Sequence, residues 1–254
     1  MSMLLIAHNT FRETVRDRIL VGIVVCGLLV LGLTRVAAPL AMGEDLRLTV
    51  DLGLSAITWL GMLIVLMVGA SLVAKEIDRK IIFNLLSRPL PRPLYLVGKW
   101  AGLTATLMSF ALLMGAALAI EVTLLGHAAL LPSLAQALYL LCLELAVVTS
   151  VAVMFSALST PVLSALYTLG LFLAGQWCDD LRAFALQAPG SLRALLEAAA
   201  NLLPNLPLFN MRALVAAGEL TTVVHLGLAT SYAAMYCGCV LLLGAAAFES
   251  RDFR

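Results

Sequence analysis

Long uninterrupted apolar stretches constrain this chain more than any other feature of its sequence. A membrane-spanning helix needs about 20 mostly apolar residues to cross a hydrocarbon layer of about 30 Å. Six stretches approach or exceed that length: residues 19–42, 52–74, 100–125, 134–159, 161–177 and 223–248. Hydrophobic residues make up 62% of the chain and charged residues only 12%, which is far from the composition of a soluble domain. The sequence therefore predicts an integral membrane protein.

The apolar stretches also indicate the type of secondary structure. They are continuous rather than alternating between polar and apolar residues, which favours helices over the strands of a barrel. We expect an all-α fold with six transmembrane helices in one transmembrane domain, residues 1–254. We further expect an interfacial helix at 1–18, a cytoplasmic coupling loop at 76–99, and an outer segment at 178–222 that forms a helical hairpin.

Basic residues predict the orientation, because they are enriched in cytoplasmic loops. A cytoplasmic amino terminus places most of them inside: Arg12, Arg16, Arg18, Lys75, Arg79, Lys80, Arg88, Arg92, Lys99, Arg251 and Arg254. Fewer fall outside: Arg35, Arg47, Arg182, Arg193 and Arg212. We therefore expect a multi-pass protein of the cell (inner) membrane with both termini in the cytoplasm.

The residues before the first apolar stretch form an imperfect amphipathic helix. At 100° per residue, Leu4, Ala7, Phe11 and Val15 fall on one side, opposite Arg12, Glu13, Arg16 and Asp17. Leu5 and Ile6 break this pattern. Such a helix, ending near Arg18, would lie on the cytoplasmic membrane surface with its arginines near anionic lipid headgroups. A short solvated leader is the alternative.

The segment from Lys75 to Lys99 holds six of the 16 Lys and Arg residues of the chain. Its first part, Glu76 to Leu86, predicts a helix whose apolar side carries Ile77, Ile81, Ile82, Leu85 and Leu86. Pro89, Pro91 and Pro93 then prevent the helix from continuing, because proline lacks an amide donor and restricts the residue before it. We expect the chain to return to the membrane at about Tyr95 to Trp100.

The outer segment predicts two short apolar helices. Ser191 is a candidate N-cap for a helix that reaches about Leu203. Pro204 and Pro207 break it, and a second helix at 208–217 would end at Gly218. This arrangement indicates an external cap or a re-entrant hairpin.

Two acidic residues lie within predicted spans, Glu121 near the end of the third and Glu144 near the middle of the fourth. Intramembrane carboxyl groups are costly, so they are candidates for function. For Glu144 a translocation role and a structural role remain equally open, whereas Glu121 favours a structural role. The histidines, cysteines and methionines show no metal-site spacing, and no phosphate-binding loop or hydrolase motif occurs. We expect no metal, no enzyme activity and no nucleic-acid binding.

The charged loop resembles the first cytoplasmic loop of ABC-2 type transporter permeases. The matching residues are Glu76, Leu85, Leu86, Ser87, Pro89, Arg92, Tyr95, Gly98 and Lys99. The leader residues Glu13, Arg16 and Arg18 also resemble the interfacial helix of that family. Pro204, Asn205, Phe209, Asn210 and Arg212 are similar to the subgroup associated with multicopper enzyme maturation, the nitrous oxide reductase accessory type.

The resemblance implies a permease that forms a homodimer and binds two separate cassette ATPase subunits. ATP and magnesium would bind to those partners, and this chain itself would bind no cofactor. The ATPase-coupling residues would be Glu76, Ile77, Arg79, Ile81, Leu85, Arg88, Pro89, Arg92, Tyr95, Gly98 and Lys99. Membrane lipid and an outer accessory protein are further expected partners. The resemblance implies export or transmembrane movement of a substrate that the sequence does not identify.

Three alternatives remain at this stage. The charged loop could serve only to set the topology. A secondary transporter or channel could use Glu144 and Glu121 as proton or cation sites. An intramembrane enzyme would need polar pairs at similar depth, which the sequence does not reveal.

Overall fold

We analysed a computed structural model, which describes residues 3–37, 45–72 and 92–249. All regular elements in these ranges are helices, as the apolar stretches predict. The long helices are α2 (Arg18–Ala37), α3 (Asp45–Ile64), α7 (Arg92–Leu124), α8 (Leu131–Leu158), α9 (Pro161–Gln176) and α13 (Val223–Glu249). The shorter ones are α1 (Met3–Val15), α4 (Ala70–Leu72), α10 (Cys178–Gln187), α11 (Gly190–Leu202) and α12 (Arg212–Ala217). A π-helical turn, Val65–Gly69, joins α3 to α4, and two 3₁₀ turns occupy Ala128–Leu130 and Pro207–Phe209.

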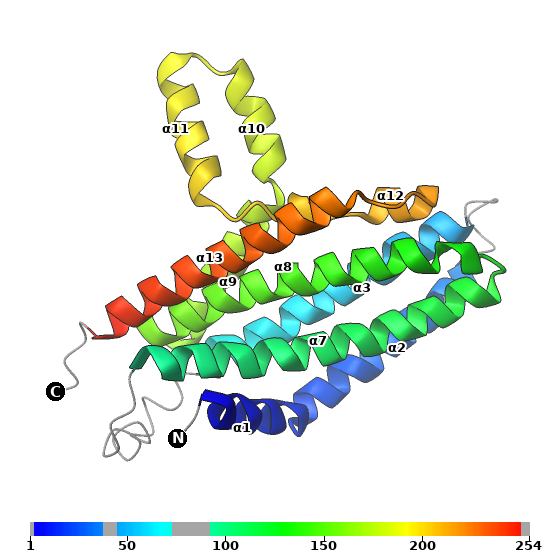
Figure 1. The fold of residues 1–254 in the computed structure, drawn as a ribbon, viewed down its shortest axis with the longest axis horizontal. Coiled ribbons are helices and arrows are strands. Elements are labelled where there is room, and N and C mark those ends of the chain that lie inside the picture. Colours follow the sequence, from blue (N-terminus) through cyan, green and yellow to red (C-terminus); the bar gives the residue numbers. More distant parts are fainter. Residues whose placement is uncertain (1–2, 38–44, 73–91, 250–254) are drawn as a thin grey trace.

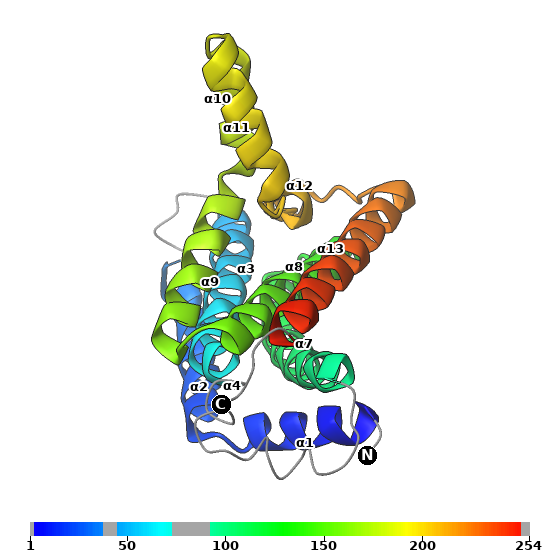
Figure 2. The ribbon, with the colours of Figure 1, turned by 90° about the vertical axis from the view of Figure 1, so that its left-hand side faces the viewer.

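The long helices run side by side as one bundle (Figure 1). We call the end where α1 begins and α13 finishes the terminal end, and the end where α7 passes into α8 the distal end. Figure 2 shows α1 lying across one side of the bundle, below α7, while α10 and α11 stand away from the opposite side. The helix α8 lies at the centre of the bundle, since 72% of its most apolar 18-residue stretch is buried. The corresponding share for α13 is 28%.

Four helical segments are long and apolar enough to cross a membrane: Asp45–Leu72, Pro93–Leu124, Ala128–Leu158 and Val223–Ala247. Two bent pairs raise the number to six if each pair is one span. They are α1 with α2, bent by 61°, and α9 with α10, bent by 57°. The described residues are therefore compatible with six spans, but two of these are broken helices rather than straight ones.

Proline and glycine mark the helix boundaries for reasons visible in the sequence. Pro161 begins α9, where its missing amide hydrogen costs nothing. Gly126, with a φ of 85°, permits the turn between α7 and α8. Gly218, with a φ of 74°, caps the end of α12, as the sequence predicts.

Buried hydroxyl groups inside the bundle mostly bond to their own helix. Thr149 donates to the carbonyl of Leu145 at 2.6 Å, and Thr168 donates to that of Ser164 at 2.7 Å. These bonds remove the cost of placing a polar group in an apolar interior. The interior can therefore carry many Ser and Thr residues without a polar path through it.

The segment between α9 and α13 differs from the sequence prediction. It contains three helices, not two, because α10 was not predicted. The hairpin forms between α10 and α11, whereas α12 returns to pack on α3 and α8. The two acidic residues Asp179 and Asp180 lowered the apolar character of α10, yet they occupy its first turn, where negative charge stabilises a helix.

Candidate functional site

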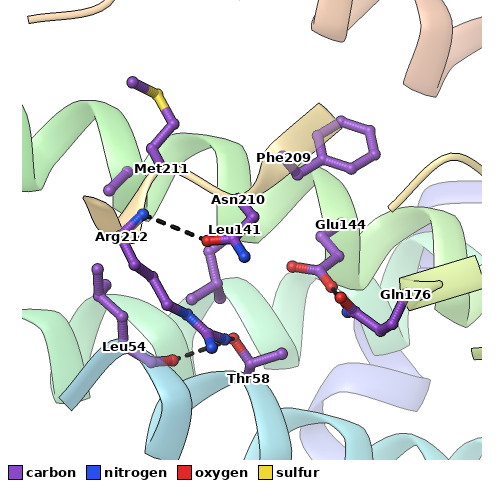
Figure 3. Close-up of a pocket in the computed structure, with 10 residues that line it drawn as sticks. Leu54, Thr58, Leu141, Glu144, Gln176, Phe209, Asn210, Met211 and Arg212 are labelled. Carbon is purple, nitrogen blue, oxygen red and sulfur yellow. Dashed lines mark hydrogen bonds between the residues drawn. The ribbon is translucent and has the colours of Figure 1, made fainter. Parts of the chain in front are cut away.

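A cluster of polar side chains lies inside the bundle, between α3, α8, α9 and α12 (Figure 3). Glu144 stands midway along α8 and is only 5% exposed. Gln176 ends α9, Arg212 begins α12, and Thr58 belongs to α3. Together with Asn210, these side chains line one cavity, which we call the polar cluster.

Hydrogen bonds join the members of the polar cluster in two separate sets. The Nε2 atom of Gln176 donates to Oε1 of Glu144 at 2.6 Å. The Nη2 atom of Arg212 donates to Oγ1 of Thr58 at 3.0 Å, and Thr58 in turn donates to the carbonyl of Leu54 at 3.0 Å. The guanidinium of Arg212 and the carboxyl group of Glu144 thus line the same cavity, each hydrogen-bonded to a polar neighbour.

The short length of α9 explains how Arg212 reaches the middle of the bundle. Its 16 residues extend over about 24 Å, less than the hydrocarbon thickness of about 30 Å. Beyond Gln176 the chain bends away into α10, and the returning segment fills the space that remains. Leu206, Phe209 and Met211 of that segment are at most 4% exposed, so they form part of the core. Their burial fixes the position of the adjoining Arg212.

Arg212 lines two cavities. The polar cluster encloses about 20 Å³, enough for about one water molecule. A larger cavity of about 340 Å³ lies on the other side, lined by Arg47, Asp51, Asn210, Arg212 and two alanines of α12. We call it the α3–α12 vestibule. Arg212 and Asn210 line both spaces, so the vestibule lies next to the cavity that Glu144 lines.

A second feature lies at the terminal end, where α1 packs across α7. Gly98 and Gly102 are one helical turn apart, and each lies against α1 without room for a side chain. A Cβ atom at Gly98 would lie 3.0 Å from Ile6. One at Gly102 would lie 2.5 Å from the carbonyl oxygen of Ala7 and 2.7 Å from Thr10. Small residues at this spacing allow two helices to approach closely. We call this contact the α1–α7 joint.

The α1–α7 joint belongs to a small core that gathers four helices. Its buried members are Ile6, Tyr95, Leu96, Val153, Ala157, Leu241 and Ala245, from α1, α7, α8 and α13. Lys99 is 4% exposed, and its ammonium group lies 5.8 Å from the ring centre of Tyr95. A displacement of α1 or of the start of α7 would therefore reach α8 and α13 directly.

Most of the predicted ATPase-coupling residues lie outside the described residues. These are Glu76, Ile77, Arg79, Ile81, Leu85, Arg88 and Pro89. Arg92 is the first residue of α7, and Tyr95, Gly98 and Lys99 follow within its first turns. Of these, Gly98 lies in the α1–α7 joint, and Tyr95 belongs to the small core around it.

The face of α1 that packs on the rest of the protein is not the apolar face that its sequence pattern predicts. Ile6, Thr10 and Thr14 are the buried residues, whereas Leu4 and Val15 are exposed. Ile6, which breaks the apolar pattern, is the residue that packs on Gly98. The exposed apolar side is then available to lipid, and the predicted interfacial residues Arg12, Glu13, Arg16 and Arg18 are exposed while Phe11 is partly buried.

The two intramembrane acids are not brought together. Oε2 of Glu121 accepts a hydrogen bond of 3.1 Å from Thr34, which links α7 to α2. Glu144 instead joins the polar cluster. Sequence analysis did not predict the roles of Gln176 and Thr58, although Gln176 is an amide within an apolar stretch and could have been noted on that ground.

Comparison with known proteins gives one match. The family described as ABC-2 family transporter protein matches residues 4–211, from the first turn of α1 to the residue before Arg212. A search of curated proteins found no match. The matched range includes α1, the joint, and the first five long helices of the bundle. The assignment of this chain to the nitrous oxide reductase accessory subgroup stays a prediction. This multi-pass membrane chain belongs to the ABC-2 transporter family, whose members are the membrane components of ABC transporters.

Proposed function

We propose that this chain is a permease subunit that couples ATP hydrolysis in a separate cassette ATPase to the export of a substrate. It would act as a homodimer with two ATPase subunits, its terminal end facing the cytoplasm of an inner membrane. Family membership supports this proposal, and so does the lack of a phosphate-binding loop in the sequence.

The observation that carries the proposal is the α1–α7 joint. The last part of the predicted coupling segment, residues 92–99, forms the start of α7, and these turns are held by α1 through Gly98 and Gly102. A rigid contact between α1 and α7 would transmit a displacement caused by the ATPase to the long helices, because close-packed helices move as units.

Copurification and ATPase assays test the coupling. Glu76→Arg and Leu85→Asp should each abolish the permease-dependent stimulation of ATP hydrolysis while leaving membrane insertion intact. Glu197→Arg is the matched control, because Glu197 is an exposed residue on α11, paired only with Arg193 of the same helix among the described residues. Unchanged stimulation in Glu76→Arg and Leu85→Asp, with unchanged copurification of the ATPase, would contradict the proposal.

We also infer that the polar cluster is an outer gate. The vestibule would open to the outside, and the bond from Arg212 to Thr58 would keep it separate from Glu144 in the resting state. Movement of α12 away from α3 would break this bond and join the two spaces.

A secondary transporter is the second candidate, because Glu144 is a buried carboxyl group at mid-depth. It predicts uptake or efflux driven by an ion gradient without an ATPase, and loss of that transport in Glu144→Gln. Transport in proteoliposomes that requires ATP and the partner subunit would exclude it.

A further inference from the structure

We propose that the α3–α12 vestibule binds a small phosphate ester that carries hydroxyl groups. The proposal names a ligand class for the vestibule of the proposed outer gate, but it rests on the lining residues and not on coupling to an ATPase. Two parts of the chain that are far apart in sequence supply this lining. They are the first two turns of α3 and the segment 210–216.

The vestibule has the volume of a small organic ligand. It encloses about 340 Å³, near the lower end of the range of about 300–1,000 Å³ for ligand pockets. A water molecule takes up about 30 Å³, so this space corresponds to about eleven non-hydrogen atoms. Ala213 and Ala216 leave it open, because their side chains end at Cβ. The volume suits a small metabolite and not a lipid with its acyl chains.

Arg212 is a partly buried cation without a carboxylate partner. Its Nη2 atom donates to Thr58 at 3.0 Å, which uses one of the five N–H donors of the guanidinium. Within the described part of the chain no carboxylate oxygen lies within 4 Å of it, and Glu144 bonds to Gln176 instead. The remaining nitrogen atoms of the guanidinium are accessible and not sealed in the core. A partly buried charge without a counter-charge is unfavourable, so Arg212 indicates an anionic ligand.

Asn210 adds a second donor beside Arg212. Its Oδ1 atom accepts a hydrogen bond of 3.2 Å from the backbone N–H of Arg212 (Figure 3). Because the oxygen is committed to this bond, the Nδ2 group remains as a donor, and it has no acceptor among the residues that the structure describes. Asn210 is exposed and lines the vestibule, so its amide is available to a ligand there.

Two further charges lie at the exposed rim of the vestibule. Arg47 and Asp51 are four residues apart on α3, which is about one helical turn. Arg47 raises the positive potential at the entrance, an effect of its charge that does not require its N–H groups to be unpaired. With Arg212 it outweighs Asp51, so the lining carries one net positive charge.

These groups favour a phosphate ester over a carboxylate. A phosphate monoester carries about 1.5–2 negative charges at neutral pH, which suits two guanidinium groups better than the single charge of a carboxylate. Its three oxygen atoms can accept from both Arg212 and Asn210. Asp51 accepts but does not donate, so it would receive hydrogen bonds from hydroxyl groups of the same ligand. A phosphate monoester of a small polyol, about the size of glycerol 3-phosphate, meets all of these conditions.

Calorimetric titration of the full-length protein in detergent tests the site. Glycerol 3-phosphate should bind about tenfold more tightly than propyl phosphate, which lacks the hydroxyl groups that would donate to Asp51. Asp51→Ala should remove this preference. Asp45→Ala should retain it, because it changes the charge of α3 equally but lies outside the vestibule. Equal affinity of the wild type for the two esters, or equal preference in the two variants, would overturn the proposal.

Matched alanine variants on α12 test the location. Ala216 lines the vestibule, whereas the next residue, Ala217, is exposed and does not. Ala216→Phe should weaken the binding of glycerol 3-phosphate about tenfold, while Ala217→Phe should leave it unchanged. Equal affinities would refute binding in the vestibule. Arg212→Gln should also weaken binding, unlike Arg193→Gln on α11, and the alanine pair decides the question if Arg212→Gln does not fold.

Two comparisons identify the source of the ligand and separate this site from coupling. The affinity should be equal in detergent and in phosphatidylglycerol nanodiscs at the same high salt concentration, which screens the surface charge of the lipid. Loss of binding in the nanodiscs would mean that a lipid phosphate occupies the site, and it would overturn the assignment to a soluble ester. The titration uses this chain without an ATPase. Unchanged ATPase stimulation in Glu76→Arg would therefore contradict the coupling proposal and leave the binding result intact.

Discussion

Replacing Gly102 by alanine is the most direct test of the α1–α7 joint. The added Cβ would lie 2.5 Å from the carbonyl oxygen of Ala7 and 2.7 Å from the Cβ of Thr10. The first of these atoms belongs to the backbone, so no side-chain rotation can relieve the contact. The helix α1 must therefore move away from α7.

The expected magnitude follows from two opposing effects. Overpacking a close contact costs about 1–3 kcal/mol. Alanine in place of glycine in a helix contributes about 0.5–1 kcal/mol of stability in return. Gly102→Ala should therefore lower the free energy of unfolding by up to about 2.5 kcal/mol, toward the upper end because the contact is with a backbone atom. Gly227→Ala is the matched control, because its Cβ meets no atom within 4 Å, and this variant should be as stable as the wild type or slightly more stable.

Two measurements check this expectation. Unfolding in mixed micelles gives the difference in free energy between Gly102→Ala and Gly227→Ala. Hydrogen exchange of residues 3–15 shows whether α1 has lost its support, since local opening raises exchange rates where packing is lost. Equal stability and equal exchange in the two variants would refute the inference that Gly102 holds α1 on α7.

Three further substitutions test other parts of the structure. Arg212→Gln should lower the free energy of unfolding by about 1–3 kcal/mol, because it leaves Glu144 buried without a nearby cation. The control Arg193→Gln, on the exposed face of α11, should change it by less than about 0.5 kcal/mol. Equal unfolding midpoints for the two variants would contradict this expectation. Gly218→Val should cost about 1–2 kcal/mol, because a β-branched residue at a φ of 74° is strained, and unfolding titration would detect the loss. Glu121→Gln should cost less than about 1 kcal/mol, because its amide can still accept the bond from α2; a larger loss in the same titration would assign Glu121 a role beyond that bond.

The sequence predicts some elements well for physical reasons. Apolar length predicts the long helices because a spanning segment must satisfy its backbone internally. Pro161 begins α9 and Gly218 ends α12 through local geometry alone, so their effects need no tertiary information. The helix α10 was not predicted, because its charged first turn and mixed composition resemble a loop. The apolar pattern of α1 did not predict which of its faces packs on the protein. The residue that covers Ile6 is Gly98, which is far away in sequence.

Sequence alone therefore determines that this chain is helical, resides in a membrane, and concentrates basic residues in one loop before α7. Those properties depend on local composition and on the free energy of transfer into lipid, both of which are additive along the chain. Tertiary structure alone decides that Glu144 bonds to Gln176 and shares a cavity with Arg212, because this depends on α9 ending short of the full hydrocarbon thickness and on a returning segment that fills the space beyond it. The same holds for Gly98 and Gly102. Their lack of a side chain matters only because α1 crosses α7 at these two residues.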